Sequence, residues 1–430
     1  MNASAGEPLA VEGTVAPGFE SVRDQFEQDL RTMAEENVQL CIYHRGEKVV
    51  DLWGSATGDE NFSADSIINV FSSGKSLESI AMAWLVGKGL LDYGAKIIKY
   101  WPEFGGNGKE DLTVAELMRH EGGLAAFDVS IPAEDLVAEN IKQNRIGKLI
   151  EDHPQRFPKR EGRTREYHAV TRGWIVNEVF RRIDPAGRTI GEFLREEISG
   201  PLEADAIIGV QESELARISK VSSLGFGFLF RESLKPKRFG RRIMHGFFQL
   251  LGRLLRLLPG MRHATTRGMP APLVGMDGVG FFDERVASMG ETPSAGAKCS
   301  ARGLAKIAAM MSAGGTWEGR EYISEAAWKS MHDHPLEAEM GFGSTHFTQG
   351  GVNLFVESGG RSNGMHRAFN SGREGFYGWM GLGGSLFQWH PEHEIGFGYV
   401  PTSLHVIDFV NERGKVYQAE VLRCVQKMAG

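Results

Sequence analysis

Cysteine is scarce in this 430-residue sequence: Cys41, Cys299 and Cys424 lie far apart and form no Cys-x-x-Cys motif. Neither a disulfide framework nor a zinc site is therefore indicated. An uncharged apolar run of about 18 residues, the minimum for a membrane-spanning helix, is also missing. The first segment, MNASAGEPLAVEGTVAPGFE, has neither a signal-peptide nor a transit-peptide pattern. We therefore expect a soluble, cytoplasmic protein that needs no metal and no cofactor.

The sequence also lacks an overall excess of positive charge. Its 55 acidic and 48 basic side chains give a net charge of −7, which argues against a nucleic-acid partner. Residues 231–262 are an exception, because they carry nine lysines and arginines and one glutamate. This segment has a net charge of +8, which leaves −15 for the remainder of the chain.

Within this basic segment, residues 241–258 separate by polarity when they are placed at about 100° per residue. One half of the wheel holds the apolar residues Ile243, Met244, Phe247, Phe248, Leu250, Leu251, Leu254, Leu255, Leu257 and Leu258. The other half holds Arg241, Arg242, His245, Gln249, Gly252, Arg253 and Arg256. An amphipathic helix over Arg241–Leu258 is typical of peripheral membrane contact. It is also compatible with a lid or surface helix whose apolar half packs on its own protein, and both interpretations stay open.

Strand patterns lie near both ends of the chain. VQLCIYHRGEKVVDLWGS, residues 38–55, predicts two strands around HRGE, and residues 384–400 predict a second hairpin around HPEHE. Helical patterns lie mostly between them, at 19–36, 75–91, 113–120, 134–150, 170–183, 190–198 and 300–313. We expect an α/β fold of the α+β type, with one sheet domain built from residues 1–105 and 290–430 and a mainly helical insert at 106–289.

The segment NVFSSGKSLES, residues 69–79, places Ser72 three residues before Lys75 at a predicted helix start. Residues i and i+3 share a helix face, so the amine would lie beside the hydroxyl. A serine hydroxyl becomes a good nucleophile only when a neighbouring base takes its proton. Lysine can be that base if burial or a nearby cation lowers its pKa, and the apolar run that follows makes burial plausible.

Two further segments could complete such a site. Tyr167 precedes a helical pattern, and its phenol could relay protons beside a lysine, although it could equally be a core aromatic. GWMGLGGSLFQW, residues 378–389, is dense in glycine, so its backbone N–H groups could approach a substrate closely. These glycines could also form an ordinary bulge or hairpin entry.

In combination, these segments resemble the serine β-lactamase and penicillin-binding-protein superfamily, in its esterase branch related to class C β-lactamases. SSGK matches the Ser-x-x-Lys motif of these proteins. Four further segments resemble family segments that follow in the same order. They are ELMRHEGGL (116–124), YHAVTRGW (167–174), TPSAGAKCSARGLAKIAAMMSAGG (292–315) and GWMGLGGSLFQWHPEHEIGFGYV (378–400). The resemblance covers roughly residues 20–425, and an ordered series is more specific than any single motif.

The resemblance implies a β-lactamase/DD-peptidase-like fold, with an antiparallel sheet flanked by helices. It implies that Ser72 is the acylated nucleophile, that Lys75 deprotonates it and that Tyr167 is the acid–base relay. The oxyanion hole would be formed by the backbone N–H groups of Ser72 and Leu382. Residues implied to contact the substrate are Trp379, Gly381 and Gly383.

One motif departs from the family pattern. Where classical β-lactamases have Lys-Thr-Gly, and this branch usually His-x-Gly, the sequence has Trp379-Met380-Gly381. Tryptophan has only a neutral N–H donor and no charge to hold a substrate carboxylate. We therefore expect a serine hydrolase that acts through an acyl-enzyme on a small uncharged carboxylic ester or amide.

Other interpretations stay open at this stage. A transacylase would use the same residues, and a non-catalytic scaffold could keep the fold while it binds a membrane or partner through 241–258. GRSNG, residues 360–364, fits a Gly-x-Ser-x-Gly elbow at Ser362, and VNLFV before it could be the strand of that site. The segment after it, MHRAFNSGREG, is a poor helix, no histidine follows Asp408, and the order Glu374 then His390 leaves little room for the remaining elements. His390 and His393 form an incomplete metal pattern, which is more typical of a solvated turn.

Overall fold

The computed structural model describes residues 11–157, 165–341, 343–357 and 364–429. Its main element is a nine-stranded antiparallel sheet in the order β1-β3-β2-β15-β14-β13-β12-β11-β10. The strands are β1 (Val11–Val15), β2 (Asn37–His44), β3 (Glu47–Ser55), β10 (Leu336–Glu339), β11 (Ser344–Phe347), β12 (Asn353–Leu354), β13 (Tyr377–Met380), β14 (Leu386–His390) and β15 (Ile395–Pro401). Both chain ends thus build one sheet, which confirms the expected architecture.

The two hairpins that the sequence predicts form the centre of this sheet. Arg45 and Gly46 both have positive φ between β2 and β3, as the tight turn of a right-twisted hairpin requires. β14 and β15 form the second hairpin, and β15 pairs with β2 from Val38↔Pro401 to His44↔Ile395. This contact joins segments more than 350 residues apart, so the sheet closes only when the chain ends meet.

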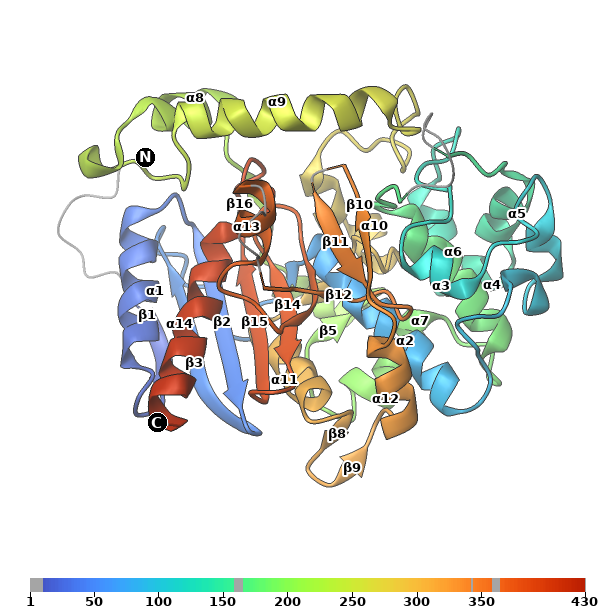
Figure 1. Cartoon of the computed structure of the whole chain (residues 1–430), viewed down its shortest axis with the longest axis horizontal. Coiled ribbons are helices and arrows are strands. Elements are labelled where there is room, and N and C mark those ends of the chain that lie inside the picture. Colours follow the sequence, from blue (N-terminus) through green and yellow to red (C-terminus); the bar gives the residue numbers. More distant parts are fainter. Residues whose placement is uncertain (1–10, 158–164, 342, 358–363, 430) are drawn as a thin grey trace.

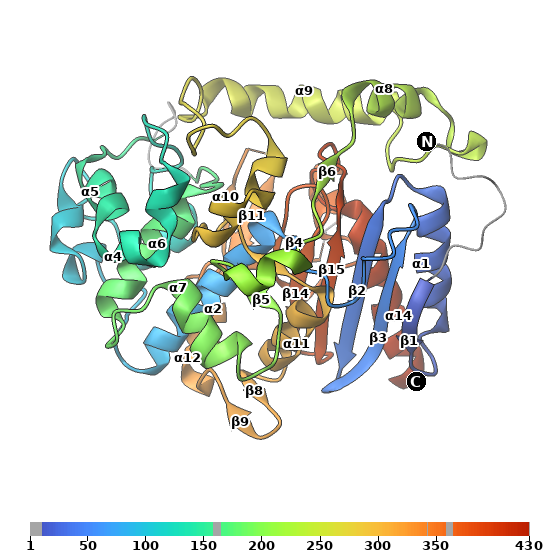
Figure 2. The same cartoon turned by 180° about the vertical axis from the view of Figure 1, so that it is seen from behind.

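Helices cover both faces of the sheet (Figure 1, Figure 2). α1 (Glu20–Thr32) and α14 (Glu412–Ala429) pack on one face, where alternate strand residues such as Leu40 and Phe397 join their core. α11 (Ala301–Ser312) packs on the other face, against β2, β14 and β15. Gly396 and Gly398 allow this close approach, because a Cβ atom at either would lie under 2.5 Å from the α11 backbone.

The remaining helices lie mostly to one side of the sheet and form the mainly helical part of the molecule (Figure 1). They are α2 (Lys75–Gly87), α3 (Val114–Met118), α4 (Ala138–Lys142), α5 (Arg145–Asp152), α6 (Thr171–Ile183), α7 (Ile190–Phe193), α8 (Phe226–Leu234), α9 (Phe247–His263), α10 (Arg285–Met289), α12 (Glu325–His332) and α13 (Gly364–Asn370). Short strands form a small sheet in the order β4-β7-β5 and the pairs β16-β6 and β8-β9. Their bounds are β4 (Ile68–Asn69), β5 (Ala206–Ile207), β6 (Ser222–Ser223), β7 (Lys298–Cys299), β8 (Thr316–Trp317), β9 (Arg320–Glu321) and β16 (Ser403–Leu404). The domain boundaries near 105 and 290 stay predictions.

Two helix predictions need correction. The single helix at 134–150 is divided, because Asn144 adopts a left-handed conformation between α4 and α5. The amphipathic helix begins at Phe247 instead of Arg241. Gly246 is extended before it, and the Arg241 guanidinium donates to the carbonyls of Ile243 and Met244, which satisfies them outside a helix. Among the described residues, no helix is long and apolar enough to span a membrane.

Candidate active site

Ser72 lies in a short 3-10 turn, Phe71–Gly74, that leads directly into α2. Phe71 has a φ of 47°, an uncommon conformation for a bulky residue and one that is typical of strained functional turns. From Val70 to Lys75, Ser72 is the residue that keeps partial exposure while its neighbours are buried. The turn therefore presents one hydroxyl to the outside from an otherwise buried helix start.

Lys75 is buried beside this hydroxyl. Its Nζ atom lies 3.2 Å from Ser72 Oγ, which confirms the expected juxtaposition on one helix face. Nζ also donates to the backbone carbonyls of Ala169, at 2.6 Å, and Ser294, at 2.9 Å. The side chain is 1% exposed. Residues from three segments that are distant in sequence, namely those around Lys75, Ala169 and Ser294, therefore meet at one nitrogen atom.

Burial holds the pKa of Lys75 well below its ordinary value. The Glu78 carboxylate opposes this effect, and the nearby Arg172 guanidinium lowers the pKa further. A neutral amine has two N–H donors and one lone pair. The two carbonyl groups can take both donors, and the lone pair is then left toward Ser72 Oγ, as a general base requires.

Tyr167 stands in the loop before α6, opposite the same pair. The Lys75 Nζ atom lies 4.8 Å from the centre of its ring. Trp379 on β13 donates its indole N–H to the Tyr167 hydroxyl at 2.9 Å. Burial raises the pKa of Tyr167 to about 12, although hydrogen bonds with Ser72 and Trp379 act in the opposite direction. The phenol is therefore protonated near neutral pH and is a proton donor rather than a resting phenolate.

The turn between β13 and β14 packs against the nucleophile turn. Ser385 Oγ donates to the Val70 carbonyl at 2.7 Å, and the Ser73 hydroxyl lies 3.0 Å from Ser385 Oγ. A Cβ atom at Gly381 would lie 2.1 Å from the Val70 oxygen, so only glycine permits this contact. Gly383 has a φ of 78° and turns the chain beyond it.

This packing brings the expected oxyanion donors into one region. Among the hydrogen bonds between described residues, none is donated by the backbone N–H of Ser72 or Leu382. Leu382 is 44% exposed at the rim of the site. Trp379, in contrast, is buried and its N–H contacts Tyr167, so the geometry favours a positioning role over substrate contact.

Sequence reasoning missed the ion pair beneath the site. Glu78 on α2 and Arg172 on α6 form a fully buried salt bridge of 2.9 Å. Arg172 also donates to the Lys75 carbonyl at 3.1 Å, and Ser294 donates its hydroxyl to Glu78. Both charged residues stand in segments that the sequence analysis singled out, but nothing in a single sequence shows that they meet. The pair fixes α2 against α6 and supplies charges that act on Lys75.

The conspicuous histidines near the site contact backbone groups. His168 Nε2 accepts the Leu124 N–H at 3.1 Å, and His120 Nδ1 accepts the His168 N–H at 3.1 Å. Burial lowers the pKa of both rings, that of His168 to about 4. They therefore hold the loop of Tyr167 in place as neutral hydrogen-bonding groups. Ser362, the centre of the alternative elbow, lies outside the described residues.

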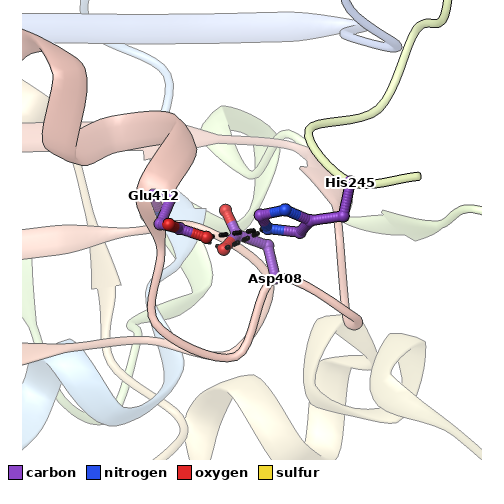
Figure 3. Close-up of side chains that lie close together, drawn as sticks. All are labelled: His245, Asp408 and Glu412. Atoms are coloured by element: carbon purple, nitrogen blue, oxygen red, sulfur yellow. Dashed lines mark hydrogen bonds and ion pairs between the residues drawn. The ribbon is translucent and has the colours of Figure 1, made fainter. Parts of the chain in front are cut away.

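A second polar cluster lies near the start of α14, where His245 points toward Asp408 and Glu412 (Figure 3). The His245 Nε2 atom lies 2.8 Å from Glu412, and Arg253 donates to the same carboxylate at 2.6 Å. Asp408 also accepts the backbone N–H groups of Glu412 and Arg413 at the start of α14. Although burial opposes it, hydrogen bonding to both carboxylates raises the pKa of His245. Because a guanidinium already neutralises this cluster, we interpret it as an ion-pair network and not as a metal centre.

Comparison with known proteins shows the family of the chain. The model of the β-lactamase family matches residues 22–420, which is nearly the whole chain. The chain belongs to the β-lactamase family. A curated relative, the esterase/β-lactamase LipL of Mycobacterium tuberculosis, is 33% identical over 171 residues. That match covers 39% of this chain and 38% of LipL, so it spans less than two thirds of the relative.

Solved structures share the β-lactamase-family fold over almost the full length. A penicillin-binding protein homologue from Caulobacter crescentus has a TM-score of 0.73 at 24% identity and covers 97% of this chain and 100% of its own. A family VIII carboxylesterase gives the same TM-score and coverages at 23% identity. EstA from Arthrobacter nitroguajacolicus Rue61a has a TM-score of 0.70 at 26% identity and covers 97% and 99%. The β-lactamase-like fold expected from the sequence is thereby confirmed.

Proposed function

We propose that this protein is a serine hydrolase that cleaves uncharged carboxylic esters through an acyl-enzyme on Ser72. The observation that carries the proposal is the buried Lys75 amine, which is held by two carbonyl groups beside the serine hydroxyl. Membership of the β-lactamase family, and the likeness to proteins named as esterases, support the same chemistry.

In the first half of the reaction, neutral Lys75 takes the proton of Ser72 while Oγ attacks the ester carbonyl carbon. The negative charge on the carbonyl oxygen is met by the N–H groups of Ser72 and Leu382. As the intermediate collapses, the bond to the alcohol breaks and Tyr167 gives the leaving oxygen a proton. The proton on Lys75 returns to Tyr167 through the hydrogen bonds around Ser72, and the acyl group remains on Oγ.

In the second half, water attacks the acyl-enzyme and loses its proton to the same base. The tetrahedral intermediate then releases the acid, and Ser72 Oγ recovers a proton from Lys75. The overall reaction is ester plus water to acid plus alcohol, with the enzyme regenerated. Trp379 supports the choice of an uncharged substrate, because it puts a neutral side chain where related enzymes carry a cation and commits its N–H to Tyr167.

For the place of this reaction, we propose a membrane surface. The support is the basic segment 231–262, which combines exposed apolar side chains with exposed arginines and lysines.

The test of the proposed chemistry is labelling with a fluorophosphonate, followed by peptide mass spectrometry and a panel of neutral esters. We expect one adduct on Ser72, with labelling and ester hydrolysis both lost in Ser72→Ala. Lys75→Met should slow both by more than about a hundredfold, since general-base catalysis contributes 10²–10⁴. Ser73→Ala is the matched control, because Ser73 is a buried neighbour that contacts Ser385. A folded protein with no adduct, or with an adduct at Ser362, would overturn the proposal.

A further inference from the structure

Most apolar side chains of α8 and α9 face outward, although Leu229 on α8 is buried. Among the described side chains of α9, none is buried. Phe226 on α8 is 85% exposed and Phe248 on α9 is 84% exposed, and exposure continues through Phe230, Leu234, Leu251, Leu254 and Leu255. A lid or surface helix that packed by its apolar half would show the reverse pattern. This open apolar strip, which we call the α8–α9 ridge, therefore lacks its partner in the isolated chain.

The polar edge of α9 attaches the ridge to the rest of the molecule. The Arg253 side chain is only 14% exposed, because it lies against Glu412 and His245. Arg242 donates to the Met33 carbonyl, and its own carbonyl accepts the N–H of Ala34. The ridge is thus held from its polar side, and this fixes its apolar side away from the protein. Both views show it as a long straight edge along the molecule (Figure 1, Figure 2).

Aromatic rings join the two helices into one surface. The centre of the Phe230 ring lies 6.5 Å from that of Phe226 and 6.1 Å from that of Phe247. Phe247 in turn lies 5.6 Å from Phe248. Exposed cations border this row, namely Arg231, Lys237, Arg238, Arg242, Arg256 and Arg262. Aromatic and aliphatic side chains bordered by lysine and arginine match the interfacial layer of a membrane, where apolar groups enter the acyl region and cations meet phosphates.

Charge decides between a membrane and a second copy of this chain. The segment 231–262 carries +8, whereas the rest of the chain carries −15. A two-fold dimer through the ridge would set positive charge against positive charge. An anionic bilayer attracts the ridge and repels the rest of the molecule, so it also orients the protein on its surface.

The ridge is bonded to the surroundings of the candidate active site at two points, one after α9 and one between α8 and α9. After α9, Thr265 donates its N–H and hydroxyl to the carboxylate of Glu166, the residue before Tyr167. Before α9, His245 reaches Asp408, whose N–H is bonded to the His405 carbonyl, and the His405 N–H in turn binds the Gly383 carbonyl. The ridge is therefore connected to the loop of Tyr167 from the end of α9, and to the expected oxyanion turn from the segment between α8 and α9.

We propose that the α8–α9 ridge docks on an anionic lipid bilayer and that the site on Ser72 takes its ester substrate from that bilayer. Phe248 and Leu255 enter the acyl layer, and the bordering arginines bind lipid phosphates. The proposed binding to a bilayer depends only on the α8–α9 ridge. The proposed origin of the substrate rests, in addition, on the proposed ester hydrolysis. The substrate class is then a neutral ester with a long acyl chain that is dissolved in the membrane.

The test compares vesicles of phosphatidylcholine with vesicles that also contain phosphatidylglycerol. Sedimentation with vesicles measures docking, and hydrolysis is followed with a water-soluble short ester and with a long-chain ester carried in the vesicles. We expect the intact chain to bind the anionic vesicles about tenfold or more better, since each basic side chain adds attraction to anionic lipid. Phe248→Asp with Leu255→Asp should abolish binding and slow the vesicle-borne ester, and leave the soluble ester unchanged. Lys237→Gln with Arg238→Gln should weaken binding only to the anionic vesicles.

Met428→Asp is the matched control, because Met428 is 48% exposed near the C-terminus, away from the ridge. It should change neither binding nor hydrolysis. Absence of vesicle binding, or a dimer in solution that Phe248→Asp dissociates, would overturn the docking proposal. Equal use of the vesicle-borne ester by the intact chain and the ridge variant would overturn the proposed origin of the substrate. If neither ester is hydrolysed while vesicles are bound, the proposed hydrolysis fails and the docking proposal is upheld.

Discussion

The environment of Lys75 sets which protonation state the candidate site can use. Two carbonyl groups and one hydroxyl surround Nζ, and no water-exposed surface is available to stabilise a charge. Burial therefore lowers the lysine pKa, while it raises that of Tyr167 to about 12. Because the two pKa values move in opposite directions relative to a free lysine and tyrosine, they open a pH range in which the base is neutral while the acid is still protonated.

This separation predicts the pH dependence of kcat/KM for a neutral ester. Protonated Lys75 is inactive, so the rate should rise with pH through its lowered pKa and reach a plateau. The fall should come only where Tyr167 ionises, near pH 12. A pH profile, corrected for spontaneous hydrolysis, measures both limbs. A free lysine has a pKa of about 10.4. A rising limb at that pH would therefore contradict a buried neutral base.

Trp379 should act through Tyr167. Trp379→Phe removes the N–H that holds the phenol and keeps most of the aromatic volume. Because such a hydrogen bond contributes about 1 kcal/mol, we expect kcat to fall about five- to tenfold with KM nearly unchanged.

Steady-state kinetics on a soluble ester measure this effect. Trp389→Phe is the matched control: it removes an equivalent bond, from Trp389 to His332, within the core. Its kcat should equal that of the unaltered protein. A larger change in KM than in kcat for Trp379→Phe would instead indicate that the side chain contacts substrate.

The contact of two turns sets the geometry of the expected oxyanion hole. One turn begins α2 and the other joins β13 to β14, and Ser385 bonds them directly through the Val70 carbonyl. This contact is close because Gly381 has no side chain. The helix start alone supplies a nucleophile, and the strand turn alone supplies a donor. The site requires both at a fixed separation.

Gly381→Ala should therefore separate the turns. Its Cβ would overlap the Val70 oxygen, so the rate of fluorophosphonate labelling should fall by about a hundredfold or more, the effect of losing one oxyanion donor. Gly252→Ala, in the middle of α9 where a Cβ meets nothing within 4 Å, is the control and should label normally. Thermal unfolding by circular dichroism distinguishes local displacement from loss of the fold. A folded Gly381→Ala protein that labels at the normal rate would contradict this account.

Across the molecule, a buried ion pair connects the two ends of the chain to the site. Arg413 at the start of α14 contacts both carboxylate oxygens of Glu35, just before β2, at 2.6 Å. The same guanidinium donates to the Gly383 carbonyl at 2.7 Å. The ion pair that joins the segment before β2 to the start of α14 therefore also supports the turn that carries Leu382.

Arg413→Met should lower the free energy of unfolding by about 3–5 kcal/mol, because it leaves the Glu35 charge buried without a partner. The double variant Glu35→Leu/Arg413→Met should lose less than the sum of the two single variants, since neither charge is then unpaired. Urea denaturation of the four proteins measures this coupling. Strictly additive losses would contradict a direct role of the pair.

Prediction from sequence worked where structure depends on neighbouring residues. The two hairpins were predicted correctly, because turn residues such as Arg45 and Gly46 act locally. The helices at 134–150 and 241–258 were wrong in their bounds, because a left-handed Asn144 and a capped segment before Phe247 interrupt a continuous periodicity. Periodicity reports which side chains are apolar, but it does not report where the backbone breaks.

The order of the motifs, and with it the family and the Ser72–Lys75 spacing, could be obtained from the chain as written. The state of Lys75 could not, because it depends on carbonyls of Ala169 and Ser294 and on the charge of Arg172, which only folding brings near. The helical periodicity of α9 likewise predicted an apolar and a polar face, but not which of the two faces the rest of the protein. That direction follows from one long-range contact, Arg253 with Glu412, because an amphipathic helix turns whichever face is anchored toward its protein.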